Sequence, residues 1–205
     1  MRFSAEKYSL AAFILAISLL PATATAASAQ AGQAKSVTCS ACHGADGNSS
    51  NPEWPSLAGQ HEQYIITSLQ SFKNGDRKNV LMSSQAMILD EQAMEDLAAY
   101  YAQQSITKRT ADPNLVDQGE RLYRSGNKEK GVSACIACHG PAGRGNPLAA
   151  YPSLAGQHAK YTAAQLLAYR SKDRETDANQ MMRSVAEQLT EDEIEAVASY
   201  IQGLQ

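Results

Sequence analysis

All four cysteines of this 205-residue chain fall in two copies of one short pattern, C-x-x-C-H. The copies span residues 39–43 and 135–139, with the sequences CSACH and CIACH. In this pattern the two thiols form thioether bonds to a haem, and the adjacent histidine binds the iron. Two copies that use every cysteine indicate two covalent haem c groups. The residues expected to hold them are the cysteines and histidines of the motifs: Cys39, Cys42, His43, Cys135, Cys138 and His139.

The N-terminal residues 1–29 have the features of a secretory signal peptide. A weakly positive start precedes the eleven apolar residues 10–20, and small residues follow. The apolar run is too short for a comfortable membrane span, although a retained N-terminal anchor is the alternative. Ala27-Ser28-Ala29 fits the small-x-small rule, so we expect cleavage after Ala29, with a competing site after Ala26. Thioether attachment takes place outside the cytoplasm, which agrees with export to a bacterial periplasm.

The charge of the mature chain is a weak indicator of its binding partners. Loss of Arg2, Glu6 and Lys7 with the signal peptide changes the formal charge from −3 to −4, and haem propionates add further negative charge. An acidic chain is a poor binder of nucleic acid, and it is steered weakly toward a basic patch on a redox partner.

The two halves of the chain repeat each other. The segment WPSLAGQH at residues 54–61 recurs as YPSLAGQH at residues 151–158, at an offset of 97. Near the end of each half, LAAY at 97–100 matches VASY at 197–200 at an offset of 100. The offset changes because the second half carries three extra residues after Arg174. The repeat is typical of a duplicated domain.

Two homologous domains are therefore expected, at residues 30–108 and 109–205. The polar stretch 105–113 is the expected linker between them. Each domain has fewer than a hundred residues and few aromatic side chains, so it buries little apolar surface by itself. We expect each domain to wrap around its covalent haem, which supplies the missing core.

The spacing of apolar residues predicts an all-α fold with long loops. A capping box at residues 190–193 marks the start of the closing helix. The expected helices, apart from a short one before the first motif, are residues 63–72, 90–102, 115–123, 161–169 and 194–201. The stretches 44–55 and 140–152 are rich in glycine and proline and are expected to be loops.

The second axial ligand of each iron separates electron transfer from catalysis. Met82 lies 18 residues before Tyr100, and Met182 lies 18 residues before Tyr200. The other candidate methionines match residues of another type in this register: Met87, Met94 and Met181. A methionine is more often a flexible core filler, but the shared register favours Met82 and Met182 as axial ligands of the two irons.

Two matched pairs of basic residues have more than one reading. His61 and His158 are expected near the propionates or at the domain interface, where an imidazole can hydrogen-bond a carboxylate. Ligation of the iron by these histidines and a surface role are the alternatives. Arg77 and Arg174 are expected either to pair with propionates or to lie in solvent.

Two further matched pairs are expected beside the haems. The backbone carbonyl of Pro55 or Pro152 is placed to accept a hydrogen bond from the Nδ1–H of the motif histidine and to fix its ring. Trp54 and Tyr151 are expected to pack on the haem edge or to donate to a propionate.

On these residues the chain resembles the dihaem cytochromes c of the cytochrome c4 family. The resemblance covers the whole mature chain: the two C-x-x-C-H sites, A-C-H-G with a following D-G-N-S, the doubled P-S-L-A-G-Q-H, the matched methionines and the closing S-Y-I-Q-G-L. It implies two class I cytochrome c-type domains related by a pseudo-twofold axis, with facing propionates. It also implies a periplasmic electron carrier, soluble or peripherally attached to the membrane. The distal loop at residues 78–81 is a departure, because it is shorter than in many family members.

The expected function is electron transfer between respiratory components, such as an upstream cytochrome complex and a terminal oxidase. No enzymatic activity, small-molecule substrate or nucleic acid is expected. The alternatives are a cytochrome subunit of a flavoprotein dehydrogenase of the sulfide-oxidising type, a dihaem peroxidase, and a metal or thiol module. A zinc site requires four ligands. A thiol redox pair is typical of a βαβ context, and the sequence has no such context.

Overall fold

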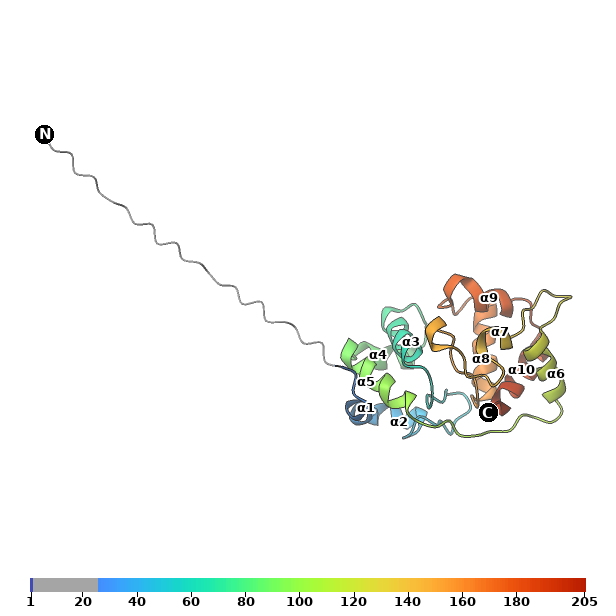
Figure 1. Cartoon of the computed structure of the whole chain (residues 1–205), viewed down its shortest axis with the longest axis horizontal. Coiled ribbons are helices and arrows are strands. Elements are labelled where there is room, and N and C mark those ends of the chain that lie inside the picture. Colours follow the sequence, from blue (N-terminus) through green and yellow to red (C-terminus); the bar gives the residue numbers. More distant parts are fainter. Residues whose placement is uncertain (2–25) are drawn as a thin grey trace.

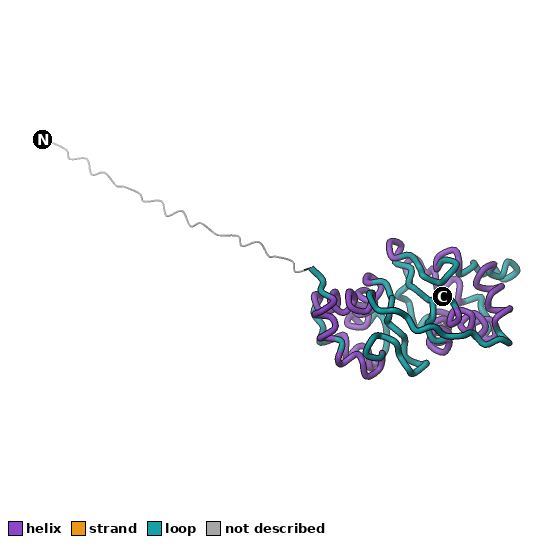
Figure 2. The backbone as a smooth tube through the Cα atoms, turned by 60° about the horizontal axis from the view of Figure 1, so that its bottom comes forward, coloured by secondary structure: helices purple, strands orange, loops and turns teal. Residues whose placement is uncertain are grey.

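The chain forms two helical lobes side by side (Figure 1). The structure is a computed structural model that describes Met1 and residues 26–205, so most of the expected signal peptide lies outside the described residues. Helices and loops make up the described part of the chain, and its only strand-like pairings are isolated bridges (Figure 2). The all-α prediction is therefore confirmed.

The helices follow the chain in the same order in both lobes. In the described residues, domain 1 contains α1 (Ala29–Lys35), α2 (Val37–His43), α3 (Glu62–Asn74), α4 (Val80–Met87) and α5 (Glu91–Ala102). Domain 2 contains α6 (Val116–Ser125), α7 (Ile136–His139), η1 (Pro147–Ala149), α8 (Ala159–Ser171), η2 (Ala178–Gln180), α9 (Met181–Ala186) and α10 (Glu191–Gly203). Every predicted helix is present, with each end within three residues of its expected position.

The short helices α4 and α9 were not predicted, and they correct the expectation of a plain loop at residues 78–81. Val80 and Leu81 form the first turn of α4. Asn79 caps this helix, because its side-chain oxygen accepts a hydrogen bond from the Met82 N–H at 2.9 Å. In domain 2, η1 interrupts the stretch 140–152 that was expected to be a loop throughout.

The first helix of each domain crosses its closing helix at very short range. A Cβ atom added at Gly32 in α1 would lie 1.9 Å from the carbonyl oxygen of Asp96 in α5. A Cβ atom added at Gly119 in α6 would lie 2.2 Å from the carbonyl oxygen of Ala196 in α10. Only glycine permits this approach of two backbones. The crossing holds the closing helices in equivalent positions in the two domains.

Each domain has its own apolar core, to which its closing helix contributes. The core of domain 1 joins α3 to α5 through Ile65, Leu97, Ala98, Tyr100 and Tyr101. The larger core of domain 2 joins α6, α8 and α10 through Leu122, Tyr123, Val132, Leu166, Leu189, Ile194, Val197, Tyr200, Ile201 and Leu204. Half-buried cysteines of the motifs, Cys39 and Cys135, pack against these cores.

The connection between the domains has no regular secondary structure over residues 105–112 and runs along one side of both lobes (Figure 1). It is fixed to both domains. The Thr107 N–H donates to Asn48 in domain 1 at 2.7 Å, and the Asp112 N–H donates to Ser199 in domain 2 at 2.8 Å. Such a tethered linker favours one relative placement of the domains.

Candidate haem sites and the interface between them

Both C-x-x-C-H motifs lie on a helix that ends at the histidine. In α2, Cys39 and Cys42 are three residues apart, and a helix carries such a pair on one face. In domain 2, Cys135 has helical backbone angles and caps α7, which contains Cys138. All four thiols are free of disulfides. Each motif therefore presents two thiols and one imidazole close together, which is the donor set that a covalent haem requires.

The motif histidines are held in the state that an iron ligand needs. His43 Nδ1 lies 2.8 Å from the carbonyl oxygen of Pro55, and His139 Nδ1 lies 3.0 Å from that of Pro152. A carbonyl only accepts, so each Nδ1 carries the proton and each Nε2 keeps its lone pair. Both imidazoles are 6% exposed, and this burial lowers the pKa of His43 and of His139, which favours the neutral form. The expected proline carbonyl contacts are confirmed.

The methionines differ in where the structure places them. Met94 is 2% exposed in the core of domain 1, whereas Met87 is 61% exposed on α4. Met181 accepts a hydrogen bond from the Tyr151 hydroxyl, with an O–S distance of 3.9 Å. Met82 and Met182 are both half-buried at the start of a short helix, and Met182 packs against the core of domain 2. The structure thus places both members of the register-matched pair half-buried near the start of a short helix, and their ligation of iron stays a prediction.

Tyr151 and Trp54, which were expected beside the haems, are both half-buried. The Tyr151 ring centre lies 6.3 Å from that of the His139 imidazole. Tyr151 thus lies between the motif histidine and the distal segment of domain 2, and its contact with a haem stays a prediction.

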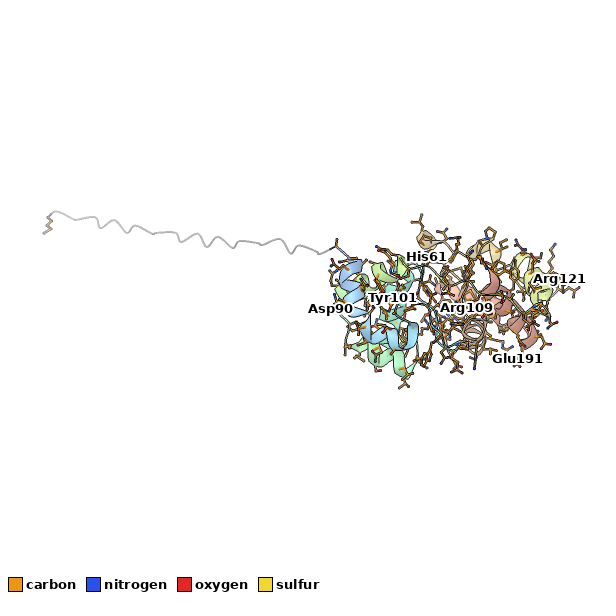
Figure 3. All side chains as sticks on the ribbon, turned by 90° about the horizontal axis from the view of Figure 1, so that it is seen from below. His61, Asp90, Tyr101, Arg109, Arg121 and Glu191 are labelled. Carbon is orange, nitrogen blue, oxygen red and sulfur yellow. The ribbon has the colours of Figure 1, made fainter. Side chains whose placement is uncertain are left out.

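The matched histidines lie at the domain interface. His61 Nε2 in domain 1 lies 2.8 Å from the Arg144 carbonyl oxygen in domain 2, and His158 Nε2 lies 2.8 Å from the Ser49 carbonyl oxygen in domain 1. Figure 3 shows His61 and Arg109 in the middle of the molecule. Burial, and then the nearby charge of Arg109, lower the pKa of His158. The interface prediction is confirmed, because each imidazole forms a hydrogen bond to the backbone of the opposite domain.

The matched arginines are buried at the same interface, so the solvated alternative is wrong. Arg77 and Arg174 are 7% and 6% exposed. Arg77 donates to the Tyr161 hydroxyl in domain 2, and Arg174 donates to the Tyr64 hydroxyl in domain 1, both at 2.9 Å. Burial opposes ionisation of Tyr64, but the charges of the two arginines outweigh it and lower the pKa of that phenol to about 8. This concentration of positive charge suits an anionic group, and pairing with propionates stays a prediction.

Gln60, Gln157 and Arg109 are among the interface residues that sequence reasoning missed. Each glutamine side chain bonds the backbone of the opposite domain. Arg109 in the linker donates to Gly156 in domain 2 and to Ser49 in domain 1. The repeat held a signal for the glutamines, because the doubled segment keeps a polar residue at the same place in both halves. The linker occurs once, so the repeat contains no signal for Arg109.

The comparisons with known proteins cover nearly the whole chain. Residues 29–105 and 116–205 each match the family model of cytochrome c. Cytochrome c4 of Pseudomonas aeruginosa is 44% identical over 196 residues, which cover 95% of this chain and 98% of that relative. The chain belongs to the cytochrome c4 family. The crystal structure of reduced recombinant cytochrome c4 from Pseudomonas stutzeri has a TM-score of 0.86 and 46% identity, and the match covers 88% of this chain and 100% of that one.

A second kind of relative differs in its name. The "thiosulfate dehydrogenase electron acceptor" of Thiomonas intermedia is 37% identical over 195 residues, covering 92% of this chain and 89% of that relative. Membership of the cytochrome c4 family gives this chain two covalent haem c groups, one at each motif, and makes it an electron carrier rather than an enzyme. The peroxidase alternative and the metal or thiol module are therefore wrong.

Proposed function

We propose that this protein carries electrons in the periplasm from an upstream cytochrome complex toward a terminal oxidase, through two haems with histidine and methionine as axial ligands. One observation carries the proposal. In both domains a buried motif histidine donates from Nδ1 to a proline carbonyl, and a half-buried methionine lies in the first turn of the short helix before the closing helix.

The proposal assigns the residues that would hold each group. Cys39 and Cys42 bind the first haem covalently, with His43 and Met82 as its axial ligands. In domain 2 the corresponding residues are Cys135, Cys138, His139 and Met182. Each haem supplies a one-electron iron couple. Two protein ligands keep the coordination unchanged between the two oxidation states, so little reorganisation opposes electron transfer, and a thioether ligand raises the potential.

Export is the second part of the proposal, with cleavage at the earlier of the two candidate sites. Ser28 caps α1, since its Oγ accepts a hydrogen bond from the Ala31 N–H at 3.3 Å. The Ser28 N–H also donates to Asp96 in the closing helix at 2.7 Å. Cleavage after Ala29 removes these contacts, whereas cleavage after Ala26 keeps them. The mass of the mature holoprotein distinguishes the two products.

The domains and the mode of membrane attachment complete the proposal. We place the boundary of the mature domains between residues 108 and 109, inside the tethered linker. Across Met1 and residues 26–205, no helix combines the length and the apolar character that a membrane crossing requires. We propose that any attachment to a membrane is peripheral, through redox partners.

A second candidate function is supported by the relative named as a thiosulfate dehydrogenase electron acceptor. In this version the electrons come from a dehydrogenase that oxidises an inorganic sulfur compound. A flavoprotein of the sulfide-oxidising type, with this chain as its cytochrome subunit, belongs to the same group of donors.

The test uses reduced holoprotein and membranes from the source organism. We expect the membranes to reoxidise both haems with uptake of oxygen, and cyanide to block this reaction if a terminal oxidase is the acceptor. Heat-treated membranes are the control. A holoprotein that active membranes leave reduced contradicts the proposed direction of flow. Reduction of the oxidised holoprotein by thiosulfate or sulfide that is faster with a soluble extract than without it identifies the second candidate.

A further inference from the structure

Two glutamines clamp the domains together in a reciprocal way. Gln157 in domain 2 accepts a hydrogen bond from the Ser56 N–H and donates to the Ser56 carbonyl, both at 2.9 Å. Gln60 in domain 1 bonds Ser153 in the same two ways, also at 2.9 Å. Each amide therefore pairs with one backbone residue of the opposite domain, in the manner of a short strand pairing.

In domain 1 the clamped backbone is also the support of the motif histidine. The peptide group between Pro55 and Ser56 has two ends. Its carbonyl accepts the hydrogen bond from His43 Nδ1 at 2.8 Å, and its N–H donates to Gln157 of domain 2. One peptide group thus joins the histidine of the first haem site to a side chain of the second domain. Ser56 is 3% exposed, so bulk water does not compete for this N–H.

Domain 2 repeats the arrangement in the opposite direction. The carbonyl of the peptide group between Pro152 and Ser153 accepts the hydrogen bond from His139 Nδ1 at 3.0 Å. Its N–H donates to Gln60 of domain 1 at 2.9 Å. Gln60 is itself only 8% exposed. The two links are therefore crossed, because one peptide group joins the motif histidine of each domain to the glutamine of the other domain.

The physical effect of such a link has a definite sign. The peptide bond is conjugated, so an acceptor at its N–H makes the nitrogen more electron-rich and raises the electron density on its carbonyl oxygen. Hydrogen bonds in a chain strengthen one another in this way, most of all where the surroundings are dry. A stronger acceptor at Nδ1–H makes the imidazole a more basic ligand. A more basic ligand favours the ferric state and lowers the reduction potential of its haem.

We propose that Gln157 and Gln60 are positioning residues that set, across the domain interface, the ligand strength of the motif histidine in the opposite domain. This inference rests on the proposed function, because it takes His43 and His139 as axial ligands of the irons. It explains why a polar residue stands at this place in both halves of the repeat. It also gives the interface a second role besides holding the domains together.

The test measures each haem separately in the holoprotein. In Gln157→Leu we expect the potential of the domain 1 haem to shift upward, while that of domain 2 stays at its wild-type value. In the reduced protein, the proton resonance of His43 Nδ1–H moves upfield because its hydrogen bond weakens. Gln60→Leu gives the mirror result, with the shift at His139.

Gln202→Leu is the matched control. The amide of Gln202 is half-buried and bonds Ala159 N–H at 2.9 Å and the Thr110 carbonyl at 2.8 Å, away from both proline–serine peptides. It should leave both potentials and both proton resonances unchanged. If leucine at position 157 prevents assembly of the holoprotein, Gln157→Asn withdraws the amide by one methylene without a change of charge, and we expect a shift of the same sign.

Other patterns overturn the inference. If the glutamine only holds the domains together, its removal shifts the potential of neither haem or of both together. The His43 Nδ1–H resonance then stays in place. A shift confined to the glutamine's own domain also contradicts the crossed link. Failure of the proposed function is visible elsewhere, because the unsubstituted holoprotein then lacks the spectrum of methionine-ligated haem.

Discussion

The segments that lead to Met82 and Met182 are built differently in the two domains. Two residues separate Arg77 from α4, whereas six separate Arg174 from α9. Asn79 caps the first segment. The second contains η2 with two left-handed residues that are not glycine, Asn179 and Gln180, at φ angles of 53° and 60°.

In domain 2 an ion pair stabilises this segment, and the sequence of domain 1 has no counterpart of it. Asp177, from the three-residue insertion, accepts hydrogen bonds from the Arg183 backbone at 3.0 Å and from its guanidinium at 2.8 Å. The left-handed residues each cost roughly 1 kcal/mol or more, and the ion pair offsets part of that cost.

The segments on the C-terminal side of the two methionines are alike in both domains. Ala86 and Ala186 are fully buried four residues later, and the closing helices then begin at equivalent positions. The C-terminal segment therefore fixes the distance of the methionine from the closing helix in both domains, whereas the segments that precede it are held by different bonds. This is why counting back from Tyr100 and Tyr200 finds a matched pair despite the insertion.

The largest effect should come from breaking the ion pair in domain 2. Arg183→Leu leaves the Asp177 side chain, which is 3% exposed, without its charged partner. We expect a loss of about 2 kcal/mol in the free energy of unfolding of domain 2, because hydrogen bonds to charged groups are among the stronger ones. Denaturant unfolding of the holoprotein measures it, and domain 1 should unfold as before.

Arg121→Leu serves as the control, because Arg121 is exposed on α6 at the outer end of domain 2 (Figure 3), and α6 does not contact α9. Its effect should stay within about 0.5 kcal/mol. An Arg183→Leu protein as stable as the control would mean that the ion pair does not support the inserted segment.

A smaller effect is expected from the cap in domain 1. Asn79→Ala removes the side-chain acceptor of the Met82 N–H and should cost about 1 kcal/mol of domain 1 stability. Asn79→Asp keeps an acceptor and should recover most of the loss. Thermal unfolding of the two holoproteins makes the comparison. Equal stability of the alanine and aspartate variants would show that the capping bond does not hold the α4 terminus.

The smallest effect is a pH dependence of stability that we expect in domain 1 and not in domain 2. Asp96 in α5 bonds Lys35 at 2.6 Å and the Ser28 N–H, and these bonds lower the pKa of its carboxyl group. Its contribution to stability is therefore present above the unfolded pKa and is lost as pH falls through the lower folded pKa. The register places Ala196 at this position in domain 2.

We expect Asp96→Asn to reduce the stability of domain 1 at pH 7 and to flatten its decline toward acid. Unfolding midpoints measured between pH 7 and pH 3 test this. An unchanged acid slope in the variant would assign the decline to other carboxyl groups.

The sequence predicted the parts of the site that lie close together along the chain or that the repeat duplicates. The motif cysteines and histidines are adjacent in sequence, and the Pro55 and Pro152 carbonyls follow at matched distances. The longer helices were predictable because their apolar residues recur at helical spacing. The register of the closing helices predicted the methionine pair, and the structure places both members half-buried near the start of a short helix.

The missed features depend on contacts between the domains or on very short elements. The eight-residue α4 and six-residue α9 are too short for a clear apolar period. The bonds of Gln60 and Gln157, and the burial of Arg77 and Arg174, arise only when one domain is placed against the other. Asp177 and Arg183 are brought together by the η2 turn. The left-handed residues of this turn are not glycines, so the sequence did not indicate it.

The most direct test of the account is a spectroscopic redox titration of the holoprotein beside Met82→Ala and Met182→Ala. Each substitution should abolish the weak sulfur-to-iron charge-transfer band of ferric haem in its own domain and lower that haem's potential, because the thioether ligand is lost. The band of the other domain should persist with about half the original intensity. Retention of the full band in either variant would contradict the assignment of that methionine as an axial ligand.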